Sequence, residues 1–224
     1  MHKIQLVVLD MAGTVVNEDN VVYKTLQKAI NQKGFDLTLD FVLEHGAGKE
    51  KHQAIRDILA QADAYGIDSE PIFENFKVLL DEAYDSLTVT SFEGVESLLK
   101  ELRSKNIKIA LNTGYATPIA EHLLEKMQWV KGDHYDVLVT ADDVLFGRPN
   151  PDMIFEAMEL LNVFEPDKVL KAGDSIIDIE EGKNAYCGIT VGVTTGAHTR
   201  TQLESAKPTY VLDSLQELIE KLDL

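Results

Sequence analysis

Carboxylates follow two short apolar stretches of the sequence, at points where a buried strand of a parallel sheet would end. Asp10 comes directly after Ile4–Leu9, and Asp174 comes shortly after Val169–Ala172. A carboxylate in such a position costs free energy unless it is paired or used. Gly13 after Asp10 allows a sharp turn whose backbone amides can bind an anion. Asp10 is therefore a candidate nucleophile that attacks phosphorus and forms an aspartyl-phosphate. For this motif taken alone, a turn or helix-cap aspartate is the better interpretation.

Two further segments could bind a phosphoryl group. Thr113 and Gly114 follow the apolar stretch Ile107–Leu111, so a hydroxyl and a backbone amide can hold a phosphoryl oxygen there. Arg148 lies in the segment GRPNPDM, where its permanent positive charge could pair with both the nucleophile and the phosphoryl group. Each motif is weak alone, but together they indicate one phosphate-handling site.

The same carboxylates predict a magnesium site. Asp178 follows Asp174 by four residues, and both are expected near Asp10. Oxygen ligands of this kind suit Mg²⁺, which would also offset the repulsion between an anionic nucleophile and an anionic substrate.

The elements that must hold these residues are predicted from hydrophobic periodicity. Short apolar runs bounded by small or polar residues are typical of strands buried on both faces of a parallel sheet. They alternate with amphipathic helical patterns, which predicts an α/β fold with a doubly wound sheet. Ligands of such sheets bind at the carboxyl ends of the strands. The predicted strands are Ile4–Leu9, Ile107–Leu111, Val137–Val139, Val169–Ala172 and, more weakly, Ile189–Val193; the helical patterns cover Val95–Lys105, Ile119–Met127 and Met153–Leu161.

The region Val16–Leu87 differs from the rest of the chain. It contains helical patterns at Lys24–Gln32, Glu50–Ala64 and Pro71–Tyr84 but no convincing buried strand. We therefore predict a helical cap domain of residues 16–87, inserted into a core domain of residues 1–15 and 88–224.

Composition limits the partners and the compartment. The 224 residues carry 21 Lys and Arg against 38 Asp and Glu, a net charge of −17, which argues against binding to nucleic acid or to an anionic membrane. The single cysteine, Cys187, excludes an internal disulfide and fits a reducing compartment. The sequence has no signal-peptide pattern and no apolar stretch of about 20 residues. We expect a cytoplasmic protein.

The order D-x-x-G-T, T-G, a basic residue before proline, and G-D-x-x-x-D resembles the haloacid dehalogenase (HAD) superfamily of phosphohydrolases over essentially the whole chain. The resemblance implies a Rossmann-like parallel sheet core with a helical C1-type cap inserted after the first strand. It also implies Asp10 as nucleophile, Thr113 as phosphate ligand, Arg148 as the basic residue, and a Mg²⁺ site. The metal ligands it implies are Asp10, Asp174, Asp178 and the backbone carbonyl of Ala12.

Ala12 is a departure from the usual pattern of that superfamily, whose phosphatases have a second aspartate there as general acid. Loss of that proton donor would slow ester cleavage by roughly 10²–10⁴-fold. The D-x-A-G-T form with arginine resembles phosphonoacetaldehyde hydrolase (phosphonatase), in which a cap lysine forms a Schiff base with the aldehyde substrate. The lysine of that family follows a G-x-x segment and precedes a histidine by three residues, a spacing matched by Gly46, Lys49 and His52.

Lys51 is a competing candidate for the cap lysine. If the segment is helical, Lys49 and His52 would lie on one helix face, and a helix N-terminus would lower the pKa of a nearby lysine. An ordinary solvated lysine is the alternative for Lys49. His52 could move protons or be inert, and Tyr115 could line the site or simply pack.

The leading hypothesis is a Mg²⁺-dependent hydrolase that cleaves the C–P bond of a small anionic phosphonate, phosphonoacetaldehyde or a close analogue. A HAD phosphatase acting on a small phosphomonoester is the second hypothesis, and a non-catalytic phosphate-binding relative is the third. The resemblance also suggests a homodimer formed through the cap, although no apolar stripe in the sequence argues for one.

Overall fold

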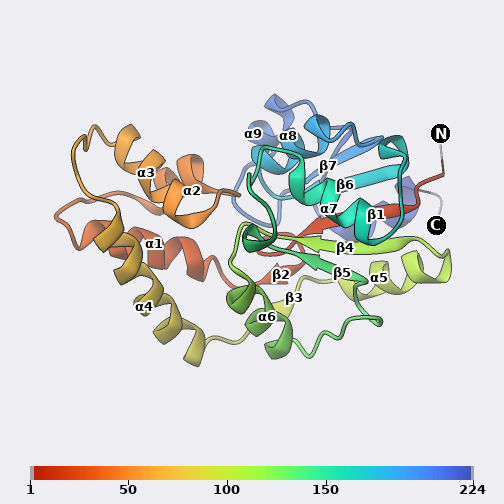
Figure 1. Cartoon of the computed structure of the whole chain (residues 1–224), viewed down its shortest axis with the longest axis horizontal. Coiled ribbons are helices and arrows are strands. Elements are labelled where there is room, and N and C mark those ends of the chain that lie inside the picture. Colours follow the sequence, from red (N-terminus) through yellow and green to blue (C-terminus); the bar gives the residue numbers. More distant parts are fainter. Residues whose placement is uncertain (1–2, 223–224) are drawn as a thin grey trace.

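A six-stranded parallel sheet forms the centre of the protein, in the order β5-β4-β1-β6-β7-β8 (Figure 1). The computed structural model describes residues 3–222. All five predicted strands are confirmed, while β8 was not predicted because its short segment is only partly buried. The strands are β1 (Leu6–Asp10), β4 (Lys108–Asn112), β5 (Val137–Val139), β6 (Val169–Gly173), β7 (Ile189–Val193) and β8 (Tyr210–Leu212).

Helices cover both faces of the sheet, as a doubly wound fold requires. Alternate residues of β1 point to opposite faces: Val7 and Leu9 belong to one hydrophobic cluster, and Leu6 and Val8 belong to another. Because both clusters are buried, the strands read as continuous apolar runs. The helices of this part are α5 (Val95–Ser104), α6 (Thr117–Lys126), α7 (Asp152–Leu160), α8 (Ile176–Asn184), α9 (Arg200–Ser205) and α10 (Leu218–Lys221), with 3₁₀ turns η1 (Ala141–Asp143), η2 (Pro166–Lys168) and η3 (Leu215–Glu217).

Four helices between β1 and α5 form a separate group beyond the carboxyl ends of the strands (Figure 1). They are α1 (Val21–Asn31), α2 (Leu39–Gly46), α3 (Lys51–Gln61) and α4 (Glu70–Ser86). An antiparallel pair, β2 (Val16–Asn17) and β3 (Thr90–Ser91), joins the chain entering this group to the chain leaving it. The sequence patterns predicted α1, α3 and α4 but missed α2 and this strand pair. The domain boundaries at residues 16 and 87 remain a prediction.

The register of the sheet brings distant parts of the sequence to one edge. Asp10 at the end of β1 lies opposite Asn112 at the end of β4, and Leu9 lies opposite Ala172 of β6. The segments that follow these strands therefore converge at the carboxyl edge, facing the four helices. No helix in the described part of the chain is long and apolar enough to cross a membrane.

Candidate active site

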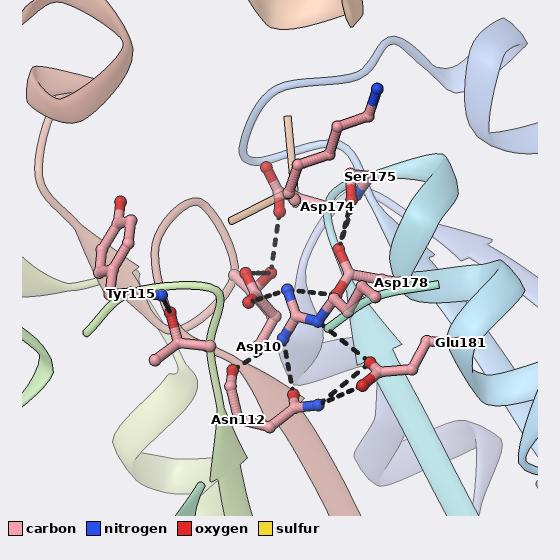
Figure 2. A network of polar contacts seen from close by, with 12 residues as sticks. Asp10, Asn112, Tyr115, Asp174, Ser175, Asp178 and Glu181 are labelled. Carbon is pink, nitrogen blue, oxygen red and sulfur yellow. Dashed lines mark hydrogen bonds and ion pairs between the residues drawn. The ribbon is translucent and has the colours of Figure 1, made fainter. Parts of the chain in front are cut away.

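Asp10 belongs to a buried network of polar side chains at the carboxyl edge of the sheet (Figure 2), and Arg148 pairs with it. The Nη1 atom of Arg148 donates to Oδ1 of Asp10 at 2.7 Å, and the arginine side chain is only 1% exposed. Burial raises the pKa of Asp10, and the charge of Arg148 opposes this. Arg148 thus holds the predicted nucleophile in a fixed orientation.

Three carboxylates meet beside this contact. Asp10, Asp174 and Asp178 each offer an oxygen within 4.8 Å of the other two. Burial and the charges of Asp10 and Asp178 raise the pKa of Asp174 well above its usual range. Burial also pushes the pKa of Asp178 upward, but Arg148 and Lys171 outweigh it and lower that pKa to about 2. Asp178 therefore favours its charged form, whereas the surroundings of Asp174 disfavour a further negative charge there.

The surrounding backbone fits a metal site of this kind. Gly13, with φ of 82°, occupies the left-handed region, and a Cβ there would collide with the Asp174 carboxylate. Gly196 approaches Asp174 as closely, and the backbone N–H of Ala197 donates to Asp174 Oδ2 at 2.6 Å. An all-oxygen set of buried carboxylates in a tight backbone cradle suits a hard divalent cation. The structure thus contains a group of residues that could hold a metal ion.

A second layer of buried residues was missed by the sequence reasoning. Lys171 Nζ donates to Asn112 Oδ1 at 2.7 Å and lies 3.0 Å from Asp178 Oδ1 and 3.2 Å from Glu181 Oε2. Glu181 also pairs with Arg148 Nε at 3.1 Å. The available signal was a lysine inside the buried strand 169–172, since a fully buried lysine requires anionic partners. These residues fix Arg148 and Asp178 in place.

Thr113, Gly114 and Tyr115 follow β4 and lie where the sequence predicted. Thr113 is buried, and its backbone N–H donates to the carbonyl of Val139 at 3.0 Å. A Cβ at Gly114 would lie 3.0 Å from the carbonyl oxygen of Lys49, so this glycine allows the loop before α3 to approach the sheet edge. Tyr115 is buried, and its ring lies 5.0 Å from Nζ of Lys51 in the four-helix group.

A small cavity joins the sheet edge to the four helices. Its free volume is about 10 Å³, far below the usual range of about 300–1,000 Å³ for ligand pockets, so the four helices lie close against the sheet edge here. Lys51 lines it, whereas Lys49 does not. Its lining residues are Asp10, Ala12, Tyr23, Gly48, Lys51, Thr113, Gly114, Tyr115, Arg148 and Asp174.

Lys49 lies outside this cavity. Its Nζ pairs with Asp57 at 2.5 Å in a partly exposed position, and it lines a different, larger cleft. Helix α3 begins at Lys51. Glu50 caps it, because its side chain accepts hydrogen bonds from the backbone amides of His52 and Gln53. Lys49 therefore precedes the helix, and the prediction that Lys49 and His52 share one helix face is wrong.

Lys51 is buried and lines the cavity together with Asp10. Its side chain donates to the carbonyl of Lys49 at 2.7 Å and lies over two aromatic rings, 5.1 Å from the centroid of Tyr23 and 5.0 Å from that of Tyr115. Burial lowers its pKa to about 8, while the charge of Asp10 partly restores it. A lysine with this pKa has a free amine in roughly a tenth of the molecules at pH 7, far more than an ordinary lysine.

Gly46 and His52 lie away from the cavity. A Cβ at Gly46 would lie 2.9 Å from Ile58 Cδ1, so this glycine allows α2 to pack against α3. His52 Nε2 lies 2.8 Å from Ser69 Oγ, and its ring stacks on Phe73 at 4.8 Å. Neither residue lines the cavity that contains Asp10.

The comparisons with known proteins agree with this geometry. Residues 7–193 match a family described as "Haloacid dehalogenase-like hydrolase". The chain is 30% identical over 238 residues to phosphonoacetaldehyde hydrolase of Bacillus cereus (strain G9842), covering 99% of this chain and 86% of that protein. It is also 30% identical over 222 residues to pyrophosphatase PpaX of Bacillus mycoides (strain KBAB4), covering 97% and 96%.

A solved structure shares the fold. The crystal structure of a phosphonoacetaldehyde hydrolase-like protein from Oleispira antarctica superposes with a TM-score of 0.84 at 22% identity, covering 98% of this chain and 91% of that one. At this level of identity the likeness concerns the arrangement of helices and strands.

Proposed function

Because the chain belongs to the haloacid dehalogenase-like hydrolase family, we propose that it hydrolyses the carbon–phosphorus bond of a 2-oxoethylphosphonate, phosphonoacetaldehyde or a close analogue. The observation that carries this proposal is that Lys51 and Asp10 line the same small cavity. The position of the usual general acid is an alanine, Ala12, so an oxygen leaving group has no carboxyl to protonate it there. Relatives named phosphonoacetaldehyde hydrolase support the substrate class.

Two covalent steps suit these residues. The free amine of Lys51 adds to the aldehyde carbon, and loss of water leaves a protonated imine. Asp10 then attacks phosphorus while the electron pair of the C–P bond moves toward the imine nitrogen, giving an enamine and an aspartyl-phosphate. Water hydrolyses the aspartyl-phosphate to free phosphate, and protonation and hydrolysis of the enamine return the amine of Lys51. The electron sink replaces the missing proton donor.

We assign the Schiff base to Lys51 in place of Lys49, although the sequence spacing favoured Lys49. Lys51 is 6% exposed and shares the cavity with the nucleophile, whereas Lys49 is held by Asp57 beside another cleft. A nucleophilic amine must reach the substrate carbon within a few ångströms, which favours the lysine that lines the cavity.

Mg²⁺ is the proposed cofactor, held by Asp10, Asp174, Asp178 and the carbonyl of Ala12. When bound, it would neutralise charge on the phosphoryl group and the carboxylates. Arg148 and the Thr113 hydroxyl bind and orient the phosphoryl oxygens, and the turn amides after Asp10 add further donors.

Removal of the metal ion is expected to stop phosphate release, and added Mg²⁺ is expected to restore it. Asp174→Asn should weaken Mg²⁺ binding by at least roughly tenfold in calorimetry. Loss of a residue that only orients a metal ligand already lowers metal affinity by about that factor, and loss of a ligand should cost no less. Asp57→Asn serves as the matched control, since Asp57 lies outside the cavity. Equal Mg²⁺ affinity in both variants would remove Asp174 from the proposed site.

A small phosphomonoester or a pyrophosphate is the second candidate substrate, favoured by the relative named pyrophosphatase. The test compares phosphate release from phosphonoacetaldehyde, pyrophosphate and common sugar phosphates. We expect phosphonoacetaldehyde to be the preferred substrate by kcat/KM. Preferential turnover of pyrophosphate or an ester would overturn the proposed C–P cleavage and favour the second candidate.

A further inference from the structure

Glu18 is a buried carboxyl residue that the steps above do not use. It lies between β2 and α1 and is only 2% exposed. Its Oε2 accepts from the backbone N–H of Val22 at 3.3 Å, and its Oε1 accepts from the Tyr115 hydroxyl at 3.5 Å. A buried carboxylate with two long hydrogen bonds is costly, so a structural role in capping α1 explains its presence poorly.

Tyr115 contacts both Glu18 and the proposed Schiff-base lysine. The Tyr115 hydroxyl contacts the Glu18 carboxyl, while Lys51 Nζ lies over the ring of the same tyrosine at 5.0 Å. Tyr23 covers Lys51 from another side, with its ring centroid 5.1 Å from Nζ. The carboxyl and the amine are therefore two ends of one buried cluster, and Tyr115 also lines the cavity that contains Asp10.

We propose that Glu18, whose carboxyl is held by the Tyr115 hydroxyl, is the proton-exchange partner of Lys51; this inference rests on the proposed function. The Lys51 ammonium first gives a proton to the Glu18 carboxylate, leaving a free amine and a neutral carboxylic acid. The amine adds to the aldehyde carbon, and its own N–H proton moves to the oxygen. Glu18 then returns its proton to that hydroxyl, which leaves as water, so the protonated imine faces a carboxylate.

The protonation balance of the cluster supports this exchange. Burial raises the pKa of Glu18 to about 8, and burial lowers the pKa of Lys51 to about 8. Proton transfer between groups of matched pKa costs little free energy. Each group acts on the other, since the charge of Lys51 lowers the pKa of Glu18 and the charge of Glu18 raises that of Lys51. The other titratable groups that face the pair are Asp10, Tyr23, Glu50, Tyr84, Tyr115, Arg148 and Asp174.

Glu18→Gln is the informative variant, because the amide oxygen can still accept from Val22 but the side chain cannot exchange a proton. The first measurement is the pKa of Lys51, read from its rate of acetylation by acetic anhydride against pH, with mass spectrometry of the Lys51 peptide. Loss of the anionic partner should lower this pKa. An unchanged pKa would overturn the inference, whatever substrate the protein hydrolyses.

The second measurement is the rate at which borohydride traps phosphonoacetaldehyde on the protein. Glu18→Gln has more free amine yet lacks the acid, so trapping should slow by roughly 10²–10³-fold. The kcat/KM of the wild type should fall on both sides of about pH 8, and the variant should lose the alkaline fall. Tyr115→Phe should behave like Glu18→Gln, whereas Tyr84→Phe, which removes a buried hydroxyl of the same cluster, should match the wild type.

The two proposals fail differently. Trapping in the wild type with an unchanged rate in Glu18→Gln would refute the role of Glu18 alone. Absence of trapping in the wild type would refute the proposed Schiff base and with it the catalytic role of Glu18, while the acetylation measurement would still decide whether Glu18 controls the pKa of Lys51.

Discussion

Replacing Lys51 with methionine is expected to lower kcat for phosphate release from phosphonoacetaldehyde by roughly 10⁴-fold or more, the scale of removing a residue that forms a covalent intermediate. Methionine has similar length and is apolar, so it suits a side chain that is 6% exposed. The variant is therefore expected to fold, and thermal denaturation would show this. The loss arises because the C–P electron pair has no protonated imine to enter.

Lys49→Met is the matched control for this prediction. Its partly exposed ion pair with Asp57 contributes at most about 1 kcal/mol to the stability of the fold. Because Lys49 does not line the cavity that contains Asp10, kcat/KM should stay within about fivefold of the wild type. The reverse result, in which Lys49→Met is inactive and Lys51→Met is active, would assign the Schiff base to Lys49 as the sequence spacing first indicated.

Asp10→Asn is expected to lower phosphate release by roughly 10⁴-fold or more while the Schiff base still forms. The carboxamide keeps the shape of the side chain and an oxygen that can accept from Arg148, but it is a poor nucleophile toward phosphorus. Quenched-flow phosphate release and borohydride trapping measure the two halves of the reaction separately. We expect borohydride to trap the substrate on Lys51 at the normal rate, while the C–P bond is not cleaved.

Two outcomes would contradict the role of Asp10. Phosphate release near the wild-type rate would mean that another group is the nucleophile. Among the described residues that line the cavity, Asp10 is the carboxylate that pairs with Arg148, at 2.7 Å. Loss of both borohydride trapping and phosphate release would mean that Asp10 is needed to form the Schiff base. Asp57→Asn again controls for the removal of a carboxylate elsewhere.

Hydrophobic patterning predicted the sheet because its strands are buried on both faces. The run Ile4–Leu9 is apolar throughout, and residues Leu6–Asp10 form a fully buried strand. The method failed where burial is partial: Tyr210–Leu212 is half-buried, and β2 and β3 have two residues each. Such short elements exist because neighbouring strands offer hydrogen bonds, which a sequence pattern does not record.

The positions of the residues proposed to bind phosphate and metal were predictable because these residues follow strand ends. Asp10, Thr113 and Asp174 each end a buried run, and a parallel sheet brings such ends together. Arg148 comes from a loop, and its place in the network depends on Asn112 and Glu181, which have no sequence signal of their own.

The cap lysine could not be decided from spacing. Gly46 and His52 matched the pattern expected around Lys49, but the choice depends on where α3 begins. Glu50 caps the helix, which leaves Lys49 in the preceding loop and turns Lys51 toward Asp10. A shift of a helix start by two residues moves a different side chain into the cavity, and sequence reasoning locates helix starts only within a few residues.

Borohydride trapping with peptide mapping tests the central claim most directly. The intact protein is mixed with phosphonoacetaldehyde, reduced with borohydride and digested, and the modified residue is identified by mass spectrometry. We predict a reduced adduct on Lys51, dependent on the aldehyde and missing from Lys51→Met. Steady release of phosphate from phosphonoacetaldehyde, with no adduct on any lysine, would contradict the account.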